Sequence, residues 1–349
     1  MTTQPGGQVL AFGELLIDLI ASGGATSLLD VEVLSVRPGG APANVAVALR
    51  RQGIDAGLCA VVGCDPFGDR LIAVLEANGV DRSRVRQDPD WDTTLALAWK
   101  DARGDGHFRL LRQADIQLNV SDVDAAGVDK LAAIVVGSVS LSRQPARAAI
   151  ERAVELARAW SVPVCFDVNM RPTIWPDSAT ARAACERPLA AATLLKLSLD
   201  DARFMLELGP SANADDAFAA LEEYGNRFVV LTDGARGAWF TSPTGDVIYL
   251  PAFEIEAREP TGAGDAFMAA VIARLIGNNW TNLSPEDIRY ASAAGALTTT
   301  REGAIDSLPT GSEIQEFLAA HELIACRNSR IQLPFPSLDF LFAGMPFSS

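Results

Sequence analysis

Lysine is almost absent from this 349-residue chain, which contains only Lys100, Lys130 and Lys196. Acidic residues outnumber basic ones 44 to 29, so the formal net charge is −15. Such a charge disfavours the broad phosphate contacts by which proteins hold nucleic acids, and we expect no nucleic-acid partner. An anionic ligand would have to be held locally, by helix N-termini, a few arginines and a metal ion.

Histidine and cysteine are scarce and scattered. The two histidines, His107 and His321, form no H-E-x-x-H motif or cluster, which excludes a recognisable zinc site. The five cysteines include no C-x-x-C pair, and their odd number predicts reduced thiols in a cytoplasmic protein.

Several catalytic and nucleotide-binding motifs are missing. The chain has no G-x-S-x-G elbow and no G-x-x-x-x-G-K-[ST] loop, because no lysine follows a glycine. No G-x-G-x-x-G follows a predicted strand, so NAD binding of the Rossmann type is poorly supported. If the protein binds ATP, it does so without a Walker loop.

Long apolar runs are also lacking. None approaches the roughly 20 residues needed to span a bilayer, so we expect no membrane partner. Residues 1–7 are polar and lack the charged and apolar regions of a signal peptide.

Shorter apolar runs alternate regularly with helical patterns. From residue 131, strands are predicted at 132–137, 164–168, 194–197 and 228–231, with amphipathic helices between them. Continuously apolar strands separated by helices predict an α/β fold whose mainly parallel sheet is covered on both faces. Further strands are predicted over 9–20 and 56–63, and strands at 31–36, 93–99 and 107–112 predict a small separate sheet. Residues 326–349 are expected to be an extended segment packed on the body or on a partner.

The stretch 262–265 (GAGD) lies directly before an apolar, Ala-rich helix. Free backbone N–H groups and the positive end of a helix dipole make such a turn an anion site, and Asp265 would place a base beside it. Those two features are what phosphoryl transfer to a hydroxyl requires. The alternative is a glycine turn with an ordinary acidic helix cap.

Polar residues also stand at the predicted ends of strands, where parallel sheets form their ligand crevice. They are Asp18, Asn169, Arg171, Lys196, Thr232 and Gly234. Arg171 could neutralise a transferring phosphate, or it could simply pair with Asp167. The turn 232–237 could equally be an ordinary hairpin. A second glycine pair, at 39–40, opens a helix and would let a ligand approach the backbone.

Several of these segments together resemble the ribokinase-like (PfkB) carbohydrate kinases. The resemblance rests on residues 39–44 (GGAPAN) and 260–265 (PTGAGD), with Lys196, 232–237 (TDGARG) and 303–309 (GAIDSLP) following the family's order. Residues 13–18 (GELLID) and 167–175 (DVNMRPTIW) resemble the fructokinases within that family. The similarity extends over roughly residues 9–320.

The resemblance implies a three-layer α/β/α kinase domain over residues 1–325 with a β-sheet lid from about 15–38 and 90–118. It implies phosphorylation of a sugar by ATP and Mg²⁺, most specifically the conversion of D-fructose to fructose 6-phosphate. It also implies a homodimer formed through the lid, for which apolar residues such as Leu95, Leu97 and Trp99 are suited. Alternatively, those side chains cover the protein's own sugar site.

Roles for individual residues follow from the same resemblance. Asp265 is implied as the catalytic base, the backbone of Gly262, Ala263 and Gly264 as the anion hole, and Arg171 as a contact to sugar and phosphate. The implied sugar-binding residues are Asp18, Gly39, Gly40, Asn44, Phe108, Arg112, Asn169, Arg171 and Asp265. The implied ATP-binding residues are Lys196, Ser198, Thr232, Gly234, Gly237, Gly262, Gly264 and Ser292.

The chain departs from the family pattern at its expected metal and adenine sites. Glu259-Pro260 replaces the usual Asp-Thr, which affects a potassium site that would involve Glu259, Thr261 and Gly303. Asp201 replaces a glutamate implied to hold Mg²⁺ through water, and Ser292 replaces a frequent asparagine. Two alternatives to a fructokinase therefore stay open: a kinase of another ketose, sugar acid or riboside, and a non-catalytic binding protein on the same fold.

Overall fold

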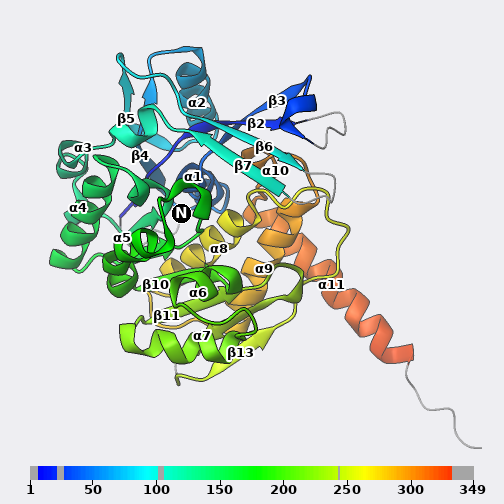
Figure 1. Cartoon of the computed structure of the whole chain (residues 1–349). Helices are drawn as coiled ribbons and strands as arrows, with labels where there is room; N and C mark the ends of the chain where they lie inside the picture. The colour runs from blue at the N-terminus through cyan, green and yellow to red at the C-terminus, as the bar shows by residue number, and fades with distance from the viewer. Residues whose placement is uncertain (1–6, 22–26, 101–105, 243, 332–349) are drawn as a thin grey trace, which may run out of the picture.

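A computed structural model describes residues 7–21, 27–100, 106–242 and 244–331 of the chain. Its centre is a nine-stranded sheet with the strand order β13-β12-β11-β10-β9-β8-β1-β4-β5 (Figure 1). Seven strands are parallel to one another, and β12 and β13 continue one edge as an antiparallel hairpin. In chain order the strands are β1 (Val9–Phe12), β4 (Ala56–Gly63), β5 (Asp81–Asp88), β8 (Ala133–Gly137), β9 (Val164–Asp167), β10 (Leu194–Ser198), β11 (Phe228–Thr232), β12 (Ala238–Thr241) and β13 (Val247–Leu250).

Helices cover both faces of this sheet, as the alternating pattern predicts. One apolar core lies beneath α1 (Ala41–Arg51), α2 (Pro66–Ala77), α8 (Ala263–Gly277), α9 (Pro285–Thr299), α10 (Ala304–Ser307) and α11 (Gly311–Ile331). The other lies beneath α3 (Val120–Asp124), α4 (Ala146–Ala159), α5 (Ser178–Ala191), α6 (Leu199–Met205) and α7 (Ala214–Leu221). The predicted three-layer α/β/α fold is confirmed. Within the described ranges, no helix is both long and apolar enough to cross a bilayer.

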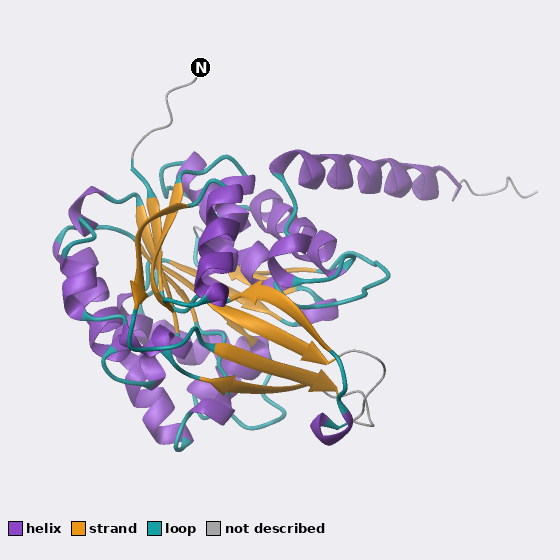
Figure 2. Cartoon of the chain, turned by 90° about the horizontal axis from the view of Figure 1, so that it is seen from above, coloured by secondary structure: helices purple, strands orange, loops and turns teal. Residues whose placement is uncertain are grey.

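A second, four-stranded sheet stands beside the main one and forms the lid (Figure 2). Its order is β3-β2-β6-β7, built from β2 (Leu16–Ala21), β3 (Leu34–Gly39), β6 (Leu95–Lys100) and β7 (Gly106–Leu111). The strands predicted at 93–99 and 107–112 are present as β6 and β7, which pair in antiparallel fashion.

Three predicted segments were wrong in detail. The single strand over 9–20 is two strands in different sheets, because the chain turns at Gly13, whose φ of +148° is accessible to glycine. The strand predicted at 31–36 begins only at Leu34. The tail expected to be extended from residue 326 is still helical as far as Ile331, and α11 points away from the body (Figure 1). Residues 332–349 lie outside the described residues.

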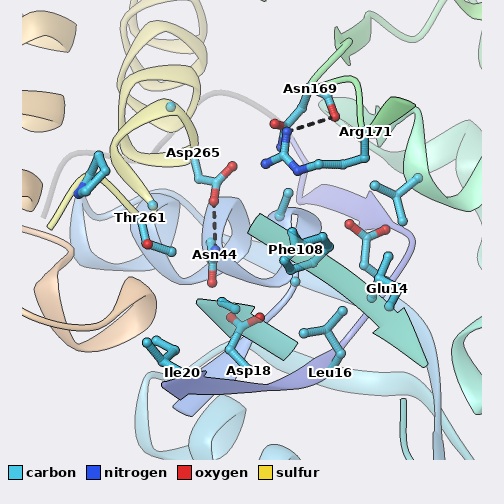
Figure 3. Close-up of a pocket in the computed structure, with 18 of the residues that line it drawn as sticks. Glu14, Leu16, Asp18, Ile20, Asn44, Phe108, Asn169, Arg171, Thr261 and Asp265 are labelled. Carbon is cyan, nitrogen blue, oxygen red and sulfur yellow. Dashed lines mark hydrogen bonds between the residues drawn. The ribbon is translucent and has the colours of Figure 1, made fainter. Parts of the chain in front are cut away.

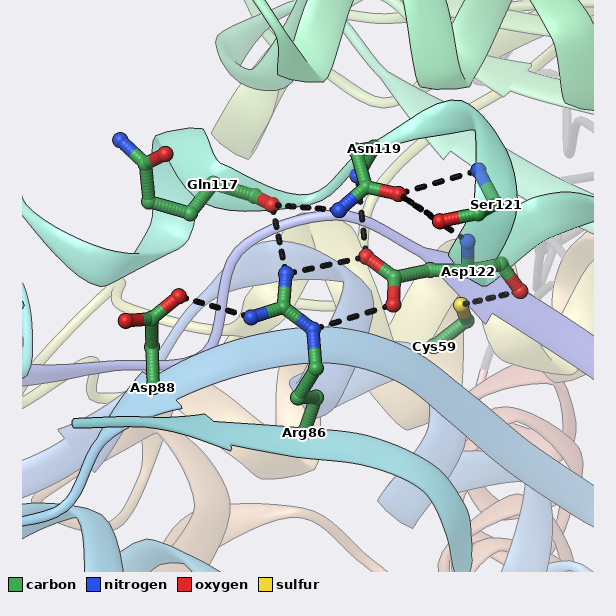
Figure 4. A network of polar contacts seen from close by, with 7 residues as sticks. All are labelled: Cys59, Arg86, Asp88, Gln117, Asn119, Ser121 and Asp122. Atoms are coloured by element: carbon green, nitrogen blue, oxygen red, sulfur yellow. Dashed lines mark hydrogen bonds and ion pairs between the residues drawn. The ribbon is translucent and has the colours of Figure 1, made fainter. Parts of the chain in front are cut away.

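Strand β5 was missed because its sequence (DRSRVRQD) is highly charged. Those charges are neutralised locally: Arg86 Nη1 lies 2.7 Å from Asp88 Oδ2, and its Nε donates to Asp122 Oδ1 at 3.1 Å (Figure 4). Arg86 Nη2 also donates to Gln117 O at 2.8 Å. The bonds to Asp122 and Gln117 connect the edge strand to α3 and to the segment before it. Arginine contacts therefore stabilise β5, which buries little apolar surface.

Candidate active site

A cavity of about 420 Å³ lies between the lid and the main sheet (Figure 3). On the lid side, the cavity is lined by alternate residues of a strand, because every second side chain of a strand points to the same face. Leu16, Asp18 and Ile20 of β2 line the cavity, and Ala98 and Phe108 approach from β6 and β7. The opposite wall is formed by α1, the segment after β9 and the start of α8.

Asp265 and Asn44 meet in the middle of this cavity (Figure 3). Asn44 Nδ2 donates to Asp265 Oδ2 at 2.7 Å, and Asp265 is only 7% exposed. Asn44 Oδ1 is buried and has no hydrogen-bond partner within the described part of the chain. A buried acceptor without a donor is costly, so this oxygen and the second carboxylate oxygen are suited to a ligand's hydroxyl groups.

Burial changes the acidity of both carboxyl groups that face the cavity. Burial raises the pKa of Asp265 to about 7, although the hydrogen bond from Asn44 opposes the shift. Burial also raises the pKa of Asp18 to about 7, and the charge of Asp265 adds to that effect. A carboxyl with a pKa near neutrality is a stronger base when ionised than an ordinary aspartate, which suits proton abstraction from a hydroxyl.

This shift predicts a pH dependence. If Asp265 removes a proton from the acceptor, it must be ionised, so kcat/KM for the acceptor should rise as the pH passes upward through about 7 and level off above it. Initial rates from about pH 5 to about pH 9 at saturating MgATP would measure this limb. A kcat/KM that stays constant down to about pH 5, as expected for an aspartate with an ordinary pKa near about 4, would contradict a buried base.

The turn before α8 has the geometry of an anion site, with one difference from the expected one. Gly262 has a φ of +83° and is the N-cap of α8, and its missing side chain allows the backbone of Ala304 to pack against it. Ala263 N–H donates to Pro260 O at 3.2 Å, so it is already engaged. The N–H groups of Gly262 and Gly264 have no backbone acceptor in the described residues. These two N–H groups and the N-terminus of α8 are therefore the groups with the chemistry to bind an anion.

Lys196 lies directly behind this turn. Its Nζ is 2.9 Å from both carboxylate oxygens of Asp167, and both residues are buried. A Cβ on Gly264 would lie 3.3 Å from Lys196 Nζ, so glycine gives the ammonium group access to the cavity. Asp167 forms its ion pair with Lys196, and none joins it to Arg171 among the described residues, so the alternative pairing of Arg171 with Asp167 is not present.

Arg171 and Asn169 line the same cavity, where the chain turns after β9. Arg171 Nη1 donates to Met170 O at 3.1 Å, and no ion pair is formed by its side chain within the described ranges. Asn169 has a φ of +36°, a conformation that asparagine tolerates better than most residues. The arginine is thus anchored by a carbonyl group while its charge is available to a ligand.

Glycines 39 and 40 allow the chain to pack closely against residues 14–18. A Cβ on Gly39 would collide with the carboxylate of Asp18, and one on Gly40 would come within 2.4 Å of Glu14 O. Gly40 also has a φ of +108°. Gly40 and Asp18 line the cavity, whereas Gly39 acts by leaving room for the Asp18 side chain.

Arg112 does not reach the cavity, contrary to the expectation. Its Nη2 lies 2.5 Å from Asp115 Oδ2, and its Nη1 donates to Ser142 Oγ at 2.8 Å and to Val139 O at 3.2 Å. The side chain is only 10% exposed, because the buried Asp115 attracts it toward the body. Arg112 is therefore a structural support beneath the lid and does not line this cavity.

Most of the expected nucleotide-site residues lie outside this cavity, either at or beyond the ends of β10 and β11 or, for Ser292, within α9. They are Ser198, Thr232, Gly234, Gly237 and Ser292. Ser198 Oγ caps α6 by accepting from Asp201 N, and Asp201 Oδ2 accepts from Ser198 N in return. The other Asp201 oxygen accepts from Met170 N at 3.0 Å. Because both oxygens are engaged by the backbone, Asp201 is a poor candidate for direct metal ligation.

The three residues of the expected cation site are only partly brought together. Glu259 Oε2 accepts a hydrogen bond from Gly303 N at 2.9 Å, whereas Thr261 lines the cavity. In the described ranges no group of three acidic, histidine or cysteine side chains is arranged to hold a metal ion. The residues present therefore do not form a metal cage of their own.

Sequence reasoning missed several apolar lining residues, among them Leu16, Ile20, Leu110 and Val139. Once Asp18 is assigned to the cavity, the period of two along a strand also assigns Leu16 and Ile20. No comparable signal marks Val139, which enters from the turn after β8.

Known proteins share this arrangement of sheet, lid and cavity. A family model described as pfkB family carbohydrate kinase matches residues 7–311. Fructokinase-1 of Zea mays is 33% identical over 317 residues, which cover 89% of this chain and 97% of the maize protein. The crystal structure of a fructokinase with bound ATP from Xylella fastidiosa aligns with a TM-score of 0.79 and 26% identity, covering 90% of this chain and 99% of that one.

A double mutant of fructokinase from Vibrio cholerae O395, in a form with fructose, ADP and potassium ion bound, aligns with a TM-score of 0.80. It is 27% identical and covers 91% of this chain and 100% of its own. These similarities confirm the ribokinase-like fold and the suggested resemblance. The chain belongs to the pfkB family of carbohydrate kinases.

Proposed function

We propose that the protein transfers the γ-phosphoryl group of ATP to the 6-hydroxyl of D-fructose, giving fructose 6-phosphate. The observation that carries this proposal is the buried Asp265–Asn44 pair, which lies beside the N-terminus of α8 in the cavity between the lid and the main sheet. Similarity to the maize and Xylella fructokinases favours fructose over other acceptors.

In the proposed reaction, Asp265 removes the proton from the primary hydroxyl as its oxygen attacks the γ-phosphorus in line. Asn44 fixes the orientation of the carboxylate through its amide hydrogen bond. Negative charge on the transferring group is stabilised by Gly262 N–H, Gly264 N–H and Arg171. The lid strands cover the sugar, which excludes water and limits hydrolysis of ATP.

Magnesium would reach the site with the phosphates of ATP and neutralise part of their charge. We assign it no direct protein ligand, because both oxygens of Asp201 are engaged by backbone N–H groups. We also propose that turnover does not require potassium, because Glu259 Oε2 is occupied by Gly303 N–H. The buried thiols of Cys59, Cys165 and Cys185 are free, which suits the cytoplasmic location that we propose.

A panel of acceptors tests the assignment. ADP release would be measured with MgATP and D-fructose, other ketoses, a sugar acid and a riboside, each with and without K⁺. We expect the highest kcat/KM for fructose, equal in both salts. A higher kcat/KM for another acceptor would replace fructose, and ATP binding without transfer to any acceptor would favour a non-catalytic binding protein.

We further propose that two copies of the chain pair through the outer face of the lid. Leu97 and Trp99 alternate along β6 with Ala98, and neither is among the residues that line the sugar cavity, which supports a role on the outer face. Leu95, expected on the same surface, instead packs against the main core. The exposed apolar residues nearby are Leu111 at 39% and Val33 at 61%.

Replacing one of these residues should abolish pairing. A charged side chain in an apolar contact would have to be desolvated, so Leu111→Lys should convert a dimer to a monomer in light scattering. Val247→Lys is a matched control, since Val247 is 38% exposed on the distant strand β13. A wild-type protein that is already monomeric would contradict this proposal.

A further inference from the structure

Asp201 holds two separate parts of the chain together. Its Oδ2 accepts a hydrogen bond from Ser198 N at 3.0 Å, and its Oδ1 accepts one from Met170 N at 3.0 Å. Ser198 ends β10, whereas Met170 lies in the turn after β9. The first bond belongs to the capping box of α6, which uses only one carboxylate oxygen. The second bond is additional, and helix capping does not account for it.

The turn after β9 needs such support, because its backbone is strained. Asn169 has a φ of +36°, a left-handed conformation that a residue with a side chain adopts at an energetic cost. Conformations of this kind persist where the surrounding contacts fix them. Ser138 Oγ donates to Asn169 O at 3.3 Å, and Val168 N donates to Lys196 O at 3.0 Å. Together with Asp201, these bonds hold the turn from the end of β8, from β10 and from α6.

The same turn carries Arg171 into the candidate active site. Arg171 Nη1 donates to Met170 O at 3.1 Å, so the backbone of Met170 binds Asp201 through its N–H and Arg171 through its carbonyl group. The Met170 side chain is buried in the apolar core, which fixes this residue further. Figure 3 shows the Arg171 side chain directed toward Asp265. Met170 therefore connects the carboxylate of Asp201 with the guanidinium group in the cavity.

We propose that Asp201 is a positioning residue, which fixes Arg171 for its contact with the transferring phosphoryl group. Asp201 acts through the backbone of Met170, whereas the family resemblance implies a magnesium ligand at this position. The role rests on the phosphate contact proposed for Arg171. Displacement of such a group by about 1 Å can lower a rate by about 10²-fold, so a residue that never touches the substrate still affects kcat.

A double-mutant cycle tests the proposal. Turnover of fructose by the full-length protein would be measured for Asp201→Ala, for Arg171→Gln and for the double variant. We expect Asp201→Ala to lower kcat about 10–100-fold when Arg171 is present. In the Arg171→Gln background the further loss should be below about twofold, because a residue that acts through Arg171 has no effect once Arg171 is absent. Equal losses in both backgrounds, or no loss in the single variant, would overturn the proposal.

Asp216→Ala is the matched control for helix capping. Asp216 Oδ2 accepts a hydrogen bond from Asn213 N at 2.9 Å in the capping box of α7, and Asp216 is exposed and lies outside the cavity. This variant should keep the wild-type kcat, and a loss equal to that of Asp201→Ala would attribute the effect to capping alone. Should Asp201→Ala not fold, Asp201→Asn weakens both hydrogen bonds while keeping the side chain, and the same cycle applies with a smaller loss.

A magnesium titration separates positioning from metal binding. At a fixed ATP concentration, the Mg²⁺ concentration that gives the half-maximal rate should be the same in Asp201→Ala and the wild type, because Mg²⁺ arrives with the phosphates of ATP. A several-fold increase in that concentration would show that Asp201 acts through the metal ion, which contradicts the proposal.

A binding measurement keeps this proposal separate from the proposed kinase activity. If the wild type phosphorylates no acceptor, the same cycle would be measured as the calorimetric affinity for a non-hydrolysable ATP analogue with Mg²⁺, relative to that for ADP. Asp201→Ala should then weaken binding of the analogue several-fold, and only when Arg171 is present. That result would support the role of Asp201 although the kinase assignment fails, and an effect independent of Arg171 would reject the role itself.

Discussion

Asp265→Asn should lower kcat by about 10²–10⁴-fold while leaving sugar binding intact. The substitution keeps the size and shape of the side chain, and the amide oxygen can still accept the hydrogen bond from Asn44 Nδ2, which is 2.7 Å long in the wild type. An amide cannot accept the proton that the attacking hydroxyl must lose. Only the base is removed, while the N-terminus of α8 and Arg171 still stabilise the transferring group.

Two measurements separate loss of the base from loss of the fold. Sugar affinity, followed by calorimetry, should stay within a few-fold of the wild type, and the unfolding midpoint should not fall, because a buried carboxyl with a raised pKa is replaced by a neutral group. Asp215→Asn is the control, since Asp215 is exposed and outside the cavity. A kcat within a few-fold of wild type would show that Asp265 is not the base.

Lys196→Met should destabilise the protein by about 3–5 kcal/mol at pH 8, the loss typical of breaking a buried ion pair on one side. Lys196 and Asp167 are both buried, and both oxygens of Asp167 lie 2.9 Å from the ammonium nitrogen. Methionine fills a similar volume but leaves the Asp167 carboxylate without its countercharge. Urea unfolding of the protein without ligands would measure the change in the free energy of unfolding.

The loss should also depend on pH. Without Lys196, burial raises the folded-state pKa of Asp167 further, so the carboxyl is neutral at low pH and must ionise as the pH rises. The destabilisation should therefore be smaller near pH 5 than near pH 8. A second substitution, Asp167→Asn in the Lys196→Met background, should restore much of the stability at pH 8. A loss below about 1 kcal/mol in the single variant would mean that the pair is solvated.

Much of the fold could be predicted because its signals are local. The apolar strands after residue 131 are buried on both faces, so each appears as an unbroken run in the sequence. Strand β5 could not be identified in this way, because its arginines are satisfied by partners such as Asp122 that are distant in the sequence. The turn at Gly13 could not be predicted either, because the sequence is apolar on both sides of it.

The candidate site was also predictable only where the signal is local in the sequence. Asp265, Asn44, Asp18, Gly40, Arg171 and Lys196 were all expected near a ligand, and they line one cavity. Arg112 was wrong because its position depends on Asp115, a buried partner that no sequence motif reveals.

Direct identification of the product is the most decisive measurement. The wild-type protein would be incubated with ATP, Mg²⁺ and D-fructose, and the products followed by ³¹P NMR beside Asp265→Asn under the same conditions. A phosphate ester at the 6-hydroxyl of fructose that forms with the wild type, and only at a trace rate with the variant, is the result that we expect. No ester with the wild type, or equal formation by both proteins, would contradict the assignment of Asp265 as the base of a fructose kinase.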